Sequence, residues 1–267
     1  MNVLITGAAG GLGRAFAAEC GRRGYSLFLT DINREGLLCL QRGLERQFNI
    51  TVTTKACDLT NAESVNEMLE LIDRHSIRFD MLLNIAGLDF EGSFMGRERE
   101  KIIEIVTLNN AATLRITHAV IQRRRKGRCF TVVFVSSLAS MFPMPLKATY
   151  AASKRFLLDF ATSLRQELKE QNVNVLALCP GGMVTTRESM EGIAAQGFWG
   201  EVTTNPLETV ARKTLDRALD GKGLYVPGSL NRTLSFLGKL IPRSIVAAVV
   251  YWRWNRAQNR WLNPAKE

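Results

Sequence analysis

The chain has 267 residues, of which 46% are hydrophobic and 22% charged, a balance that excludes an intrinsically disordered protein and favours one globular domain with or without an appendage. The net charge of +10 leaves nucleic acid, a membrane surface or an anionic substrate open as partners. The five cysteines are dispersed without a CxxC pair, and the first strand begins near the N-terminus without a secretory leader, so we expect a reduced cytoplasmic protein with no metal site.

Short apolar runs alternate with longer amphipathic stretches along most of the chain. The runs predict strands at residues 3–6, 26–31, 52–58, 81–84, 130–136 and 173–179, with a weaker one at 223–226. The amphipathic stretches predict helices that include 11–24, 34–48, 62–75, 101–125 and 149–171. Because strands alternate with helices, we expect an α/β protein with a Rossmann-type doubly wound parallel sheet.

A glycine-rich turn follows the first predicted strand and opens the first predicted helix. Gly7, Gly11 and Gly13 have the spacing GxxxGxG, with Leu12 between the last two. Glycines allow a tight turn and a close approach of a pyrophosphate, and the helix N-terminus adds free N–H groups. The turn therefore predicts a dinucleotide site, although a glycine-rich turn without a ligand is the alternative.

Asp31 ends the second predicted strand, about 20 residues after the glycine turn. An acid at this place can accept hydrogen bonds from an adenosine ribose and would repel a 2′-phosphate, so it favours NAD over NADP. Arg34 lies near enough to leave NADP(H) open, and a strand-end acid that only faces water is the other alternative.

Tyr150 and Lys154 are four residues apart in a predicted helix and therefore share one face. A free tyrosine titrates near pH 10, too high for a proton relay at neutral pH, and a neighbouring ammonium group favours the phenolate. The pair by itself is common in helices, so its meaning depends on the other motifs.

Together these motifs resemble the TGxxxGxG and Tyr-x-x-x-Lys motifs of the short-chain dehydrogenase/reductase family, and the similarity extends to about Thr186. Ser137 lies 13 residues before Tyr150, the spacing of the family's catalytic serine. Ile85 stands where the family has asparagine, which puts in doubt a hydrogen bond that braces the central strands. Further segments similar to family motifs are Asp58-Leu59, Asn84-Ile85-Ala86-Gly87, Asn109, and Pro180-Gly181 followed by Met183 and Thr185.

The resemblance implies a role for each of these residues. Tyr150 would be the general acid or base, and Lys154 would lower its pKa and hold the nicotinamide ribose. Ser137 would hydrogen-bond the substrate carbonyl, and Asn109 would help to position a water. The cofactor, with NAD(H) preferred, would contact Gly7, Gly11, Leu12, Gly13, Asp31, Asp58, Leu59, Asn84, Ala86, Gly87, Tyr150, Lys154, Pro180, Gly181, Met183 and Thr185.

Residues 186–205 have no clean period, and in the family this stretch is usually a lid over the substrate. Met190, Ile193, Phe198 and Trp199 give it apolar content, which suits a bulky hydrophobic substrate such as a steroid, a bile acid or a lipid-derived molecule. The alternative is a loop that simply packs on the body.

The last segment, residues 229–267, is basic and rich in tryptophan. Its apolar stretch is too short to span a bilayer, but arginine together with Trp252, Trp254 and Trp261 suits a lipid interface. A helix packed on the body or on a partner subunit is the alternative. A second basic run at 123–126 predicts a solvated helix end rather than a nucleic-acid patch.

We therefore expect a single catalytic domain at 1–228 that binds NAD(H), followed by a C-terminal helical tail at 229–267. The expected activity is the interconversion of a ketone and a secondary alcohol, by an enzyme that forms a homodimer or homotetramer, binds no nucleic acid and has a tail that could touch a membrane. The alternatives are a non-catalytic dinucleotide-binding regulatory protein of the same fold and an epimerase that holds NAD tightly.

Overall fold

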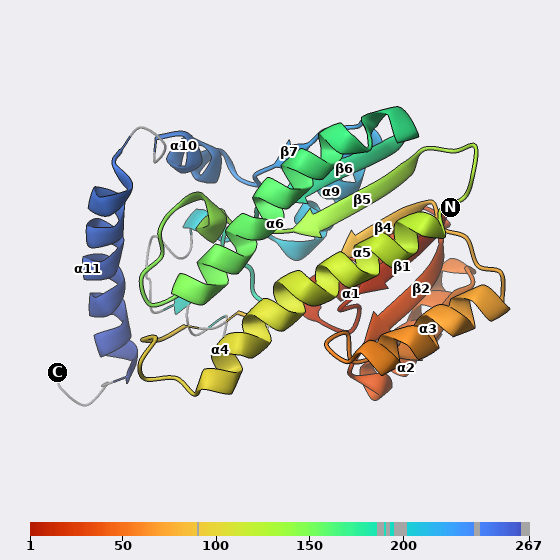
Figure 1. Cartoon of the computed structure of the whole chain (residues 1–267), viewed down its shortest axis with the longest axis horizontal. Helices are drawn as coiled ribbons and strands as arrows, with labels where there is room; N and C mark the ends of the chain where they lie inside the picture. The colour runs from red at the N-terminus through yellow and green to blue at the C-terminus, as the bar shows by residue number, and fades with distance from the viewer. Residues whose placement is uncertain (90, 186–189, 191–192, 195–201, 238–240, 263–267) are drawn as a thin grey trace.

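A seven-stranded parallel sheet forms the centre of the molecule (Figure 1). The computed structural model describes the chain except residues 90, 186–189, 191–192, 195–201, 238–240 and 263–267, and it describes no side chains at 237 or 256–262. The strand order β3-β2-β1-β4-β5-β6-β7 confirms the doubly wound sheet. The strands are β1 (Asn2–Thr6), β2 (Ser26–Asp31), β3 (Val52–Ala56), β4 (Met81–Asn84), β5 (Phe130–Val135), β6 (Val173–Leu178) and β7 (Leu224–Tyr225).

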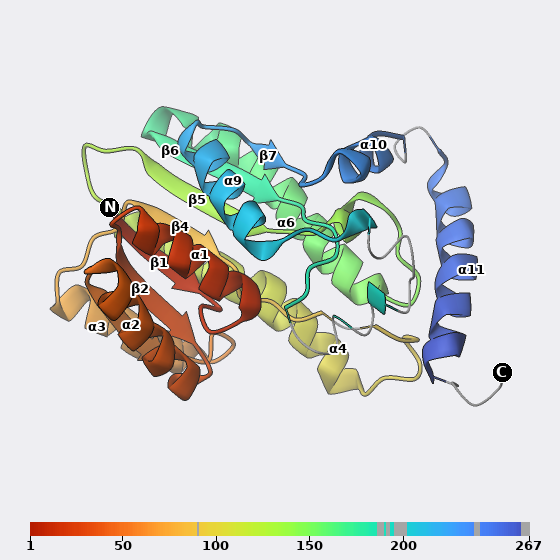
Figure 2. The same cartoon turned by 180° about the vertical axis from the view of Figure 1, so that it is seen from behind.

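Helices cover both faces of this sheet. On the face turned to the viewer in Figure 2 lie α1 (Gly11–Arg22), α2 (Arg34–Phe48) and α9 (Leu207–Leu219). Figure 1 shows the other face, with α3 (Ala62–Arg74), α4 (Arg99–Val106), α5 (Thr113–Gln122) and α6 (Ala148–Glu167). Asparagine caps begin two of the helices: Asn33 accepts from Gly36 N and Asn61 accepts from Glu63 N and Ser64 N.

Each face of the sheet has its own hydrophobic core. One core joins β1 and β2 to α1, α2 and α9, and the other joins β4 and β5 to α3, α5 and α6. The central strands are buried on both sides, so their sequences are continuous apolar runs, as in MLLN and FTVVFV. This burial makes the sheet a rigid support for the loops at its edges.

The predicted helix at 101–125 is divided in the structure. A π-helical segment, Thr107–Ala112, lies between α4 and α5, and the helix axis keeps one direction through all three segments (Figure 1). Amphipathic periodicity does not reveal one extra residue in a turn, and π-helical segments occur often at functional sites. The predicted helix at 149–171 ends at Glu167 and continues only as a short 3-10 turn, Lys169–Gln171.

Two residues of the basic run at 123–126 lie near acids of the body. Arg123 forms an ion pair with Asp73 at 2.6 Å, and Arg125 lies 3.6 Å from the buried Asp80. At the other end of the chain, α10 (Ser229–Leu237) leads to α11 (Arg243–Leu262), which stands at the edge of the molecule opposite the N-terminal half in both views (Figures 1 and 2).

Candidate active site

The candidate site lies at the carboxyl edge of the sheet, where the loops after β1, β4, β5 and β6 meet. The strand order reverses between β1 and β4, and ligands of open α/β sheets bind at such a switch point. The glycine turn follows β1, residues 84–87 begin at the last residue of β4, Ser137 follows β5 and Pro180 follows β6. The parallel register brings these four segments to the same edge.

The glycine turn packs too tightly for side chains. Gly7 has φ +65°, and a Cβ at Gly7 would lie 2.7 Å from Ala86 Cα. A Cβ on Gly13 would collide with the carbonyl oxygen of Gly7. No side chain caps the N-terminus of α1, so its first amides remain directed at the space outside the turn. These features fit the pyrophosphate of a dinucleotide.

Asp31 accepts two backbone hydrogen bonds at the end of β2. Its Oδ2 accepts from Ala9 N at 2.9 Å, within the glycine turn, and its Oδ1 accepts from Asn33 N at 2.9 Å. At the next strand, Asp58 Oδ1 accepts from both the amide and the hydroxyl of Thr60. Leu59 beside it is buried. Asp31 therefore braces the turn that it borders, and the contact of both acids with an adenosine stays a prediction.

Ile85 does not leave the central strands without a brace. The hydroxyl of Thr6 accepts from Ile85 N at 3.1 Å and from Ala86 N at 3.2 Å. Asn84 Nδ2 donates to Thr117 Oγ1 at 2.9 Å. The Ile85 side chain packs against the core on the α1 side. The threonine thus ties β1 to the segment after β4 through its single side-chain oxygen.

Ser137, Tyr150 and Lys154 gather where β5 meets α6. Lys154 is buried, and its Nζ donates to Val135 O at 2.9 Å and lies 5.7 Å from the centroid of the Tyr150 ring. Ser137 follows β5 directly, and its Oγ accepts from Ala139 N at 3.1 Å. Ser136 Oγ donates to Lys154 O at 2.7 Å, which locks α6 to the strand end.

Burial controls the proton affinities of this pair. Desolvation raises the pKa of the Tyr150 hydroxyl above its ordinary value, the Asp89 carboxylate raises it further, and a hydrogen bond with Ser137 opposes both. Desolvation also lowers the pKa of the Lys154 ammonium to about 8. Tyr150 is therefore protonated at neutral pH in the protein alone and has a proton to donate. The lowering of its pKa implied by the resemblance stays a prediction for the complex with cofactor.

Asn109 lies in the π-helical segment and is fully buried. Its Oδ1 accepts from Leu88 N at 2.8 Å, and its Nδ2 donates to Leu88 O and to Ser153 Oγ. Sequence reasoning missed Ser153, although it lies one turn from Tyr150 on α6. A Cβ on Gly87 would lie 3.0 Å from Lys154 Nζ and 3.1 Å from Asn109 Oδ1, so the structure brings these three residues together.

The segment after β6 closes the site from the other side. Pro180 O accepts from Leu138 N at 2.7 Å, and Gly181 N donates to Asn205 Oδ1 at 3.1 Å. Met183 packs against the core, and Thr185 lies against Gly11 of the glycine turn. In the predicted lid, Met190 is 52% exposed and Ile193 lies near Gly182, whereas Phe198 and Trp199 lie outside the described residues.

A second charged group beside Tyr150 has no counterpart in the sequence-based prediction. Lys147 lies 2.9 Å from Asp89 and 3.3 Å from Glu91, and its Nζ is 5.6 Å from the centroid of the Tyr150 ring. Although burial alone would lower it, the pKa of Lys147 is raised by these two carboxylates. In the sequence, the only sign of this charged group is the pair of acids, Asp89 and Glu91, soon after residues 84–87. No local pattern pairs them with a lysine almost sixty residues away.

An apolar hollow opens beside Tyr150. Its cavity volume is about 50 Å³, and it is open to solvent on one side. Backbone and side chains of the loop after β4, of α4 and of the start of α6 form its walls, among them Phe94, Ile102, Ile105 and Leu146. Because Tyr150 is part of its lining, the hollow could receive a small apolar group of a molecule whose reacting atom lies at Tyr150.

Comparison with known proteins agrees with this geometry. A family model described as short chain dehydrogenase matches residues 1–193. The chain belongs to the short-chain dehydrogenase family. A relative is the very-long-chain 3-oxoacyl-CoA reductase of Candida glabrata, which is 30% identical in an alignment of 190 residues. The match covers 64% of this chain and 53% of that protein. This short-chain dehydrogenase therefore spans about half the length of the relatives that it matches.

Solved structures share the fold of this short-chain dehydrogenase. A short-chain dehydrogenase from Sphingobium yanoikuyae in complex with NADPH has a TM-score of 0.73 and 24% identity, over 91% of this chain and 96% of that one. A 3-oxoacyl-[acyl-carrier protein] reductase from Brucella melitensis with bound NAD has a TM-score of 0.73 and 23% identity, over 85% and 89%. The two structures hold different cofactors, so they do not separate NAD from NADP for this chain.

Proposed function

We propose that the protein is an oxidoreductase that transfers a hydride between a nicotinamide cofactor and the carbon of a ketone or secondary alcohol. The observation that carries this proposal is that Ser137, Tyr150 and Lys154 lie close together at the sheet edge that also holds the glycine turn and the uncapped N-terminus of α1. A binding protein without turnover needs the turn but has no need of an acid–base group next to a buried lysine.

In the reductive direction, Tyr150 donates its proton to the carbonyl oxygen, and Ser137 holds that oxygen as negative charge develops. The nicotinamide cofactor supplies or accepts the hydride when bound. Lys154 stabilises the phenolate that remains, because its ammonium lies under the ring and is fixed by Val135 O. Asn109 holds Ser153 and Leu88, and thereby the walls around the lysine.

We propose NAD(H) as the preferred cofactor. Asp31 places a carboxylate at the end of β2, and Gly10 offers no cation in the glycine turn. Asp31→Ser should raise the ratio of kcat/KM for NADPH to that for NADH by about tenfold or more, because a like charge beside the 2′-phosphate is removed. A clear preference of the unmodified protein for NADPH would contradict the proposal and implicate Arg34.

We propose a lipid-derived substrate. The hollow beside Tyr150 is lined largely by apolar groups, and the relative from Candida glabrata is named a very-long-chain 3-oxoacyl-CoA reductase. These two observations favour an acyl chain with a 3-oxo group over a steroid or a bile acid. A panel of 3-oxoacyl thioesters of rising chain length, with steroids and simple ketones beside them, tests this choice.

The catalytic proposal is tested by Tyr150→Phe, with Tyr25→Phe as the matched control far from the site. Loss of the hydroxyl should lower kcat by about 100- to 10,000-fold while NADH binding, followed by fluorescence, is unchanged. Tyr25→Phe should keep full activity. If Tyr150→Phe kept more than about a third of kcat, Tyr150 would not be the acid–base group.

We also propose a homodimer or homotetramer that uses α4 and α6. Ile103, Val106 and Phe156 are exposed apolar side chains on these two neighbouring helices. Exposed apolar patches of this kind are typical of subunit contacts. Light scattering on Phe156→Glu should show a smaller mass than on the unmodified protein, and an unchanged mass would contradict this contact.

A further inference from the structure

One face of the helix α11 contacts the rim of the candidate site through Trp254. Trp254 Nε1 donates a hydrogen bond to Glu91 Oε1, and Lys147 Nζ lies 5.9 Å from the centroid of the Trp254 ring. Glu91 and Lys147 belong to the charged group beside Tyr150. The inner face of α11 is therefore attached directly to the entrance of the apolar hollow.

The outer face of α11 is apolar and exposed. Ile245, Val249 and Trp252 are spaced by four and three residues, which places them on one face of the helix. They are 53%, 59% and 58% exposed. Trp254 follows Trp252 by two residues, about 200° around the helix, and so points to the opposite side.

The segment that carries this face is strongly basic. From Ser229 to the end it contains seven Lys or Arg residues and one acid, Glu267. Among the residues that the structure describes, no helix is long and apolar enough to cross a membrane. A short helix with exposed aliphatic and tryptophan side chains beside arginines has the composition of an interfacial helix.

We propose that α11 docks the protein on the surface of an anionic lipid membrane through Ile245, Val249 and Trp252. Charge complementarity favours this occupant over a second copy of the chain, because two tails with the same excess of cations repel each other. Because Trp254 fixes the opposite face at the site rim, docking holds the rim of the hollow about one helix diameter, roughly 10 Å, from the lipid surface. Docking itself does not depend on the proposed reaction.

The experiment is co-sedimentation of the full-length protein with phosphatidylcholine vesicles that contain or lack phosphatidylglycerol. The unmodified protein should pellet with the anionic vesicles, and added salt should weaken the binding. The triple variant Ile245→Ser/Val249→Ser/Trp252→Ser should bind about tenfold more weakly or worse, because three apolar side chains no longer insert. The matched control Ile32→Ser/Leu38→Ser/Leu219→Ser changes exposed apolar residues elsewhere and should bind as the unmodified protein does.

Retained NADH binding shows that each variant is folded, and light scattering without vesicles gives its mass. The proposal is overturned if the unmodified protein ignores anionic vesicles, if it binds neutral ones equally well, or if the triple variant binds as the unmodified protein does. If the unmodified protein did not bind vesicles and the triple variant had a smaller mass, the same face would instead form a contact between two copies of the chain.

Discussion

Phe134 in β5 and Trp252 in α11 are both large aromatic residues in regular elements, yet their surroundings differ completely. Phe134 is fully buried and meets Phe160 edge to face, with 5.6 Å between the ring centroids. Trp252 is 58% exposed on the outer face of its helix. Burial of the first stabilises the fold, whereas the exposed area of the second adds nothing to the stability of the isolated chain. The sheet therefore positions the residues of the site, whereas the outer face of α11 is available to the proposed membrane surface.

The largest expected effect tests this contrast directly. Phe134→Ala should lower the free energy of unfolding by about 3–5 kcal/mol, because a cavity is left between β5 and α6. Trp252→Ala should change it by less than half of that amount, because more than half of this side chain is exposed to solvent. Urea denaturation followed by circular dichroism measures both values. A loss of similar size in the two variants would mean that α11 belongs to the folding core.

Burial of Lys154 in the candidate site should make the free energy of unfolding depend on pH. Its folded-state pKa of about 8 lies below the ordinary value of 10.5, so between these values the unfolded chain keeps a proton that the folded chain releases. Stability from this group therefore rises with pH across that window. Lys154→Met should lack this rise, so its stability relative to the unmodified protein should fall by about 2 kcal/mol between pH 7 and pH 10.

Urea denaturation at both pH values measures this difference, which separates Lys154 from other titrating groups such as Tyr150. The variant should also lose turnover. A stability difference that is constant with pH would show that Lys154 titrates as a solvated lysine does.

Trp254→Phe should act only on α11. The substitution keeps an aromatic ring but removes the hydrogen bond to Glu91, so local opening of the helix should become easier by about 1 kcal/mol. Hydrogen exchange of the α11 amides should accelerate, while that of α1 and β5 stays unchanged. Faster exchange throughout the sheet would show that the tail and the core open as one unit.

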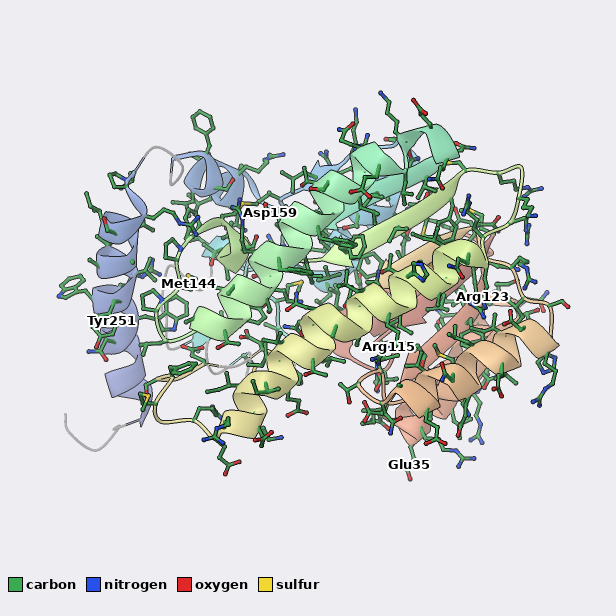
Figure 3. The ribbon with its side chains drawn as sticks, viewed as in Figure 1. Glu35, Arg115, Arg123, Met144, Asp159 and Tyr251 are labelled. Atoms are coloured by element: carbon green, nitrogen blue, oxygen red, sulfur yellow. The ribbon has the colours of Figure 1, made fainter. Side chains whose placement is uncertain are left out.

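The smallest expected effect concerns the charge beside the catalytic tyrosine. The Asp89 carboxylate raises the pKa of Tyr150, so Asp89→Asn should move the corresponding limb of the kcat/KM pH profile toward lower pH. Asp89 is partly exposed, and solvent screens the effect. Asp159→Asn, on the outer side of α6 (Figure 3), is the matched control and should leave the profile unchanged. A limb that stays in place in Asp89→Asn would remove Asp89 from the set of groups that act on Tyr150.

The sequence alone determined the strand and helix order, because each central strand is a continuous apolar run and each helix has an amphipathic face. The limits of β2, β4 and α2 agree with the predicted ranges 26–31, 81–84 and 34–48. The glycine spacing at Gly7–Gly13 and the four-residue spacing of Tyr150 and Lys154 could be found in advance from their chemistry, whereas Ser137 was found through the resemblance to the short-chain dehydrogenase/reductase family.

Only the tertiary structure decided what surrounds these motifs. The π-helical turn at Asn109 and its bond to Ser153 join two segments more than forty residues apart. The group Asp89, Glu91, Lys147 and Trp254 joins a loop, the start of α6 and the tail. Local periodicity reports which residues face a core, but it does not report which distant side chain each of them meets. That partner is set by the register of the parallel strands and by the packing of helices across the sheet edge.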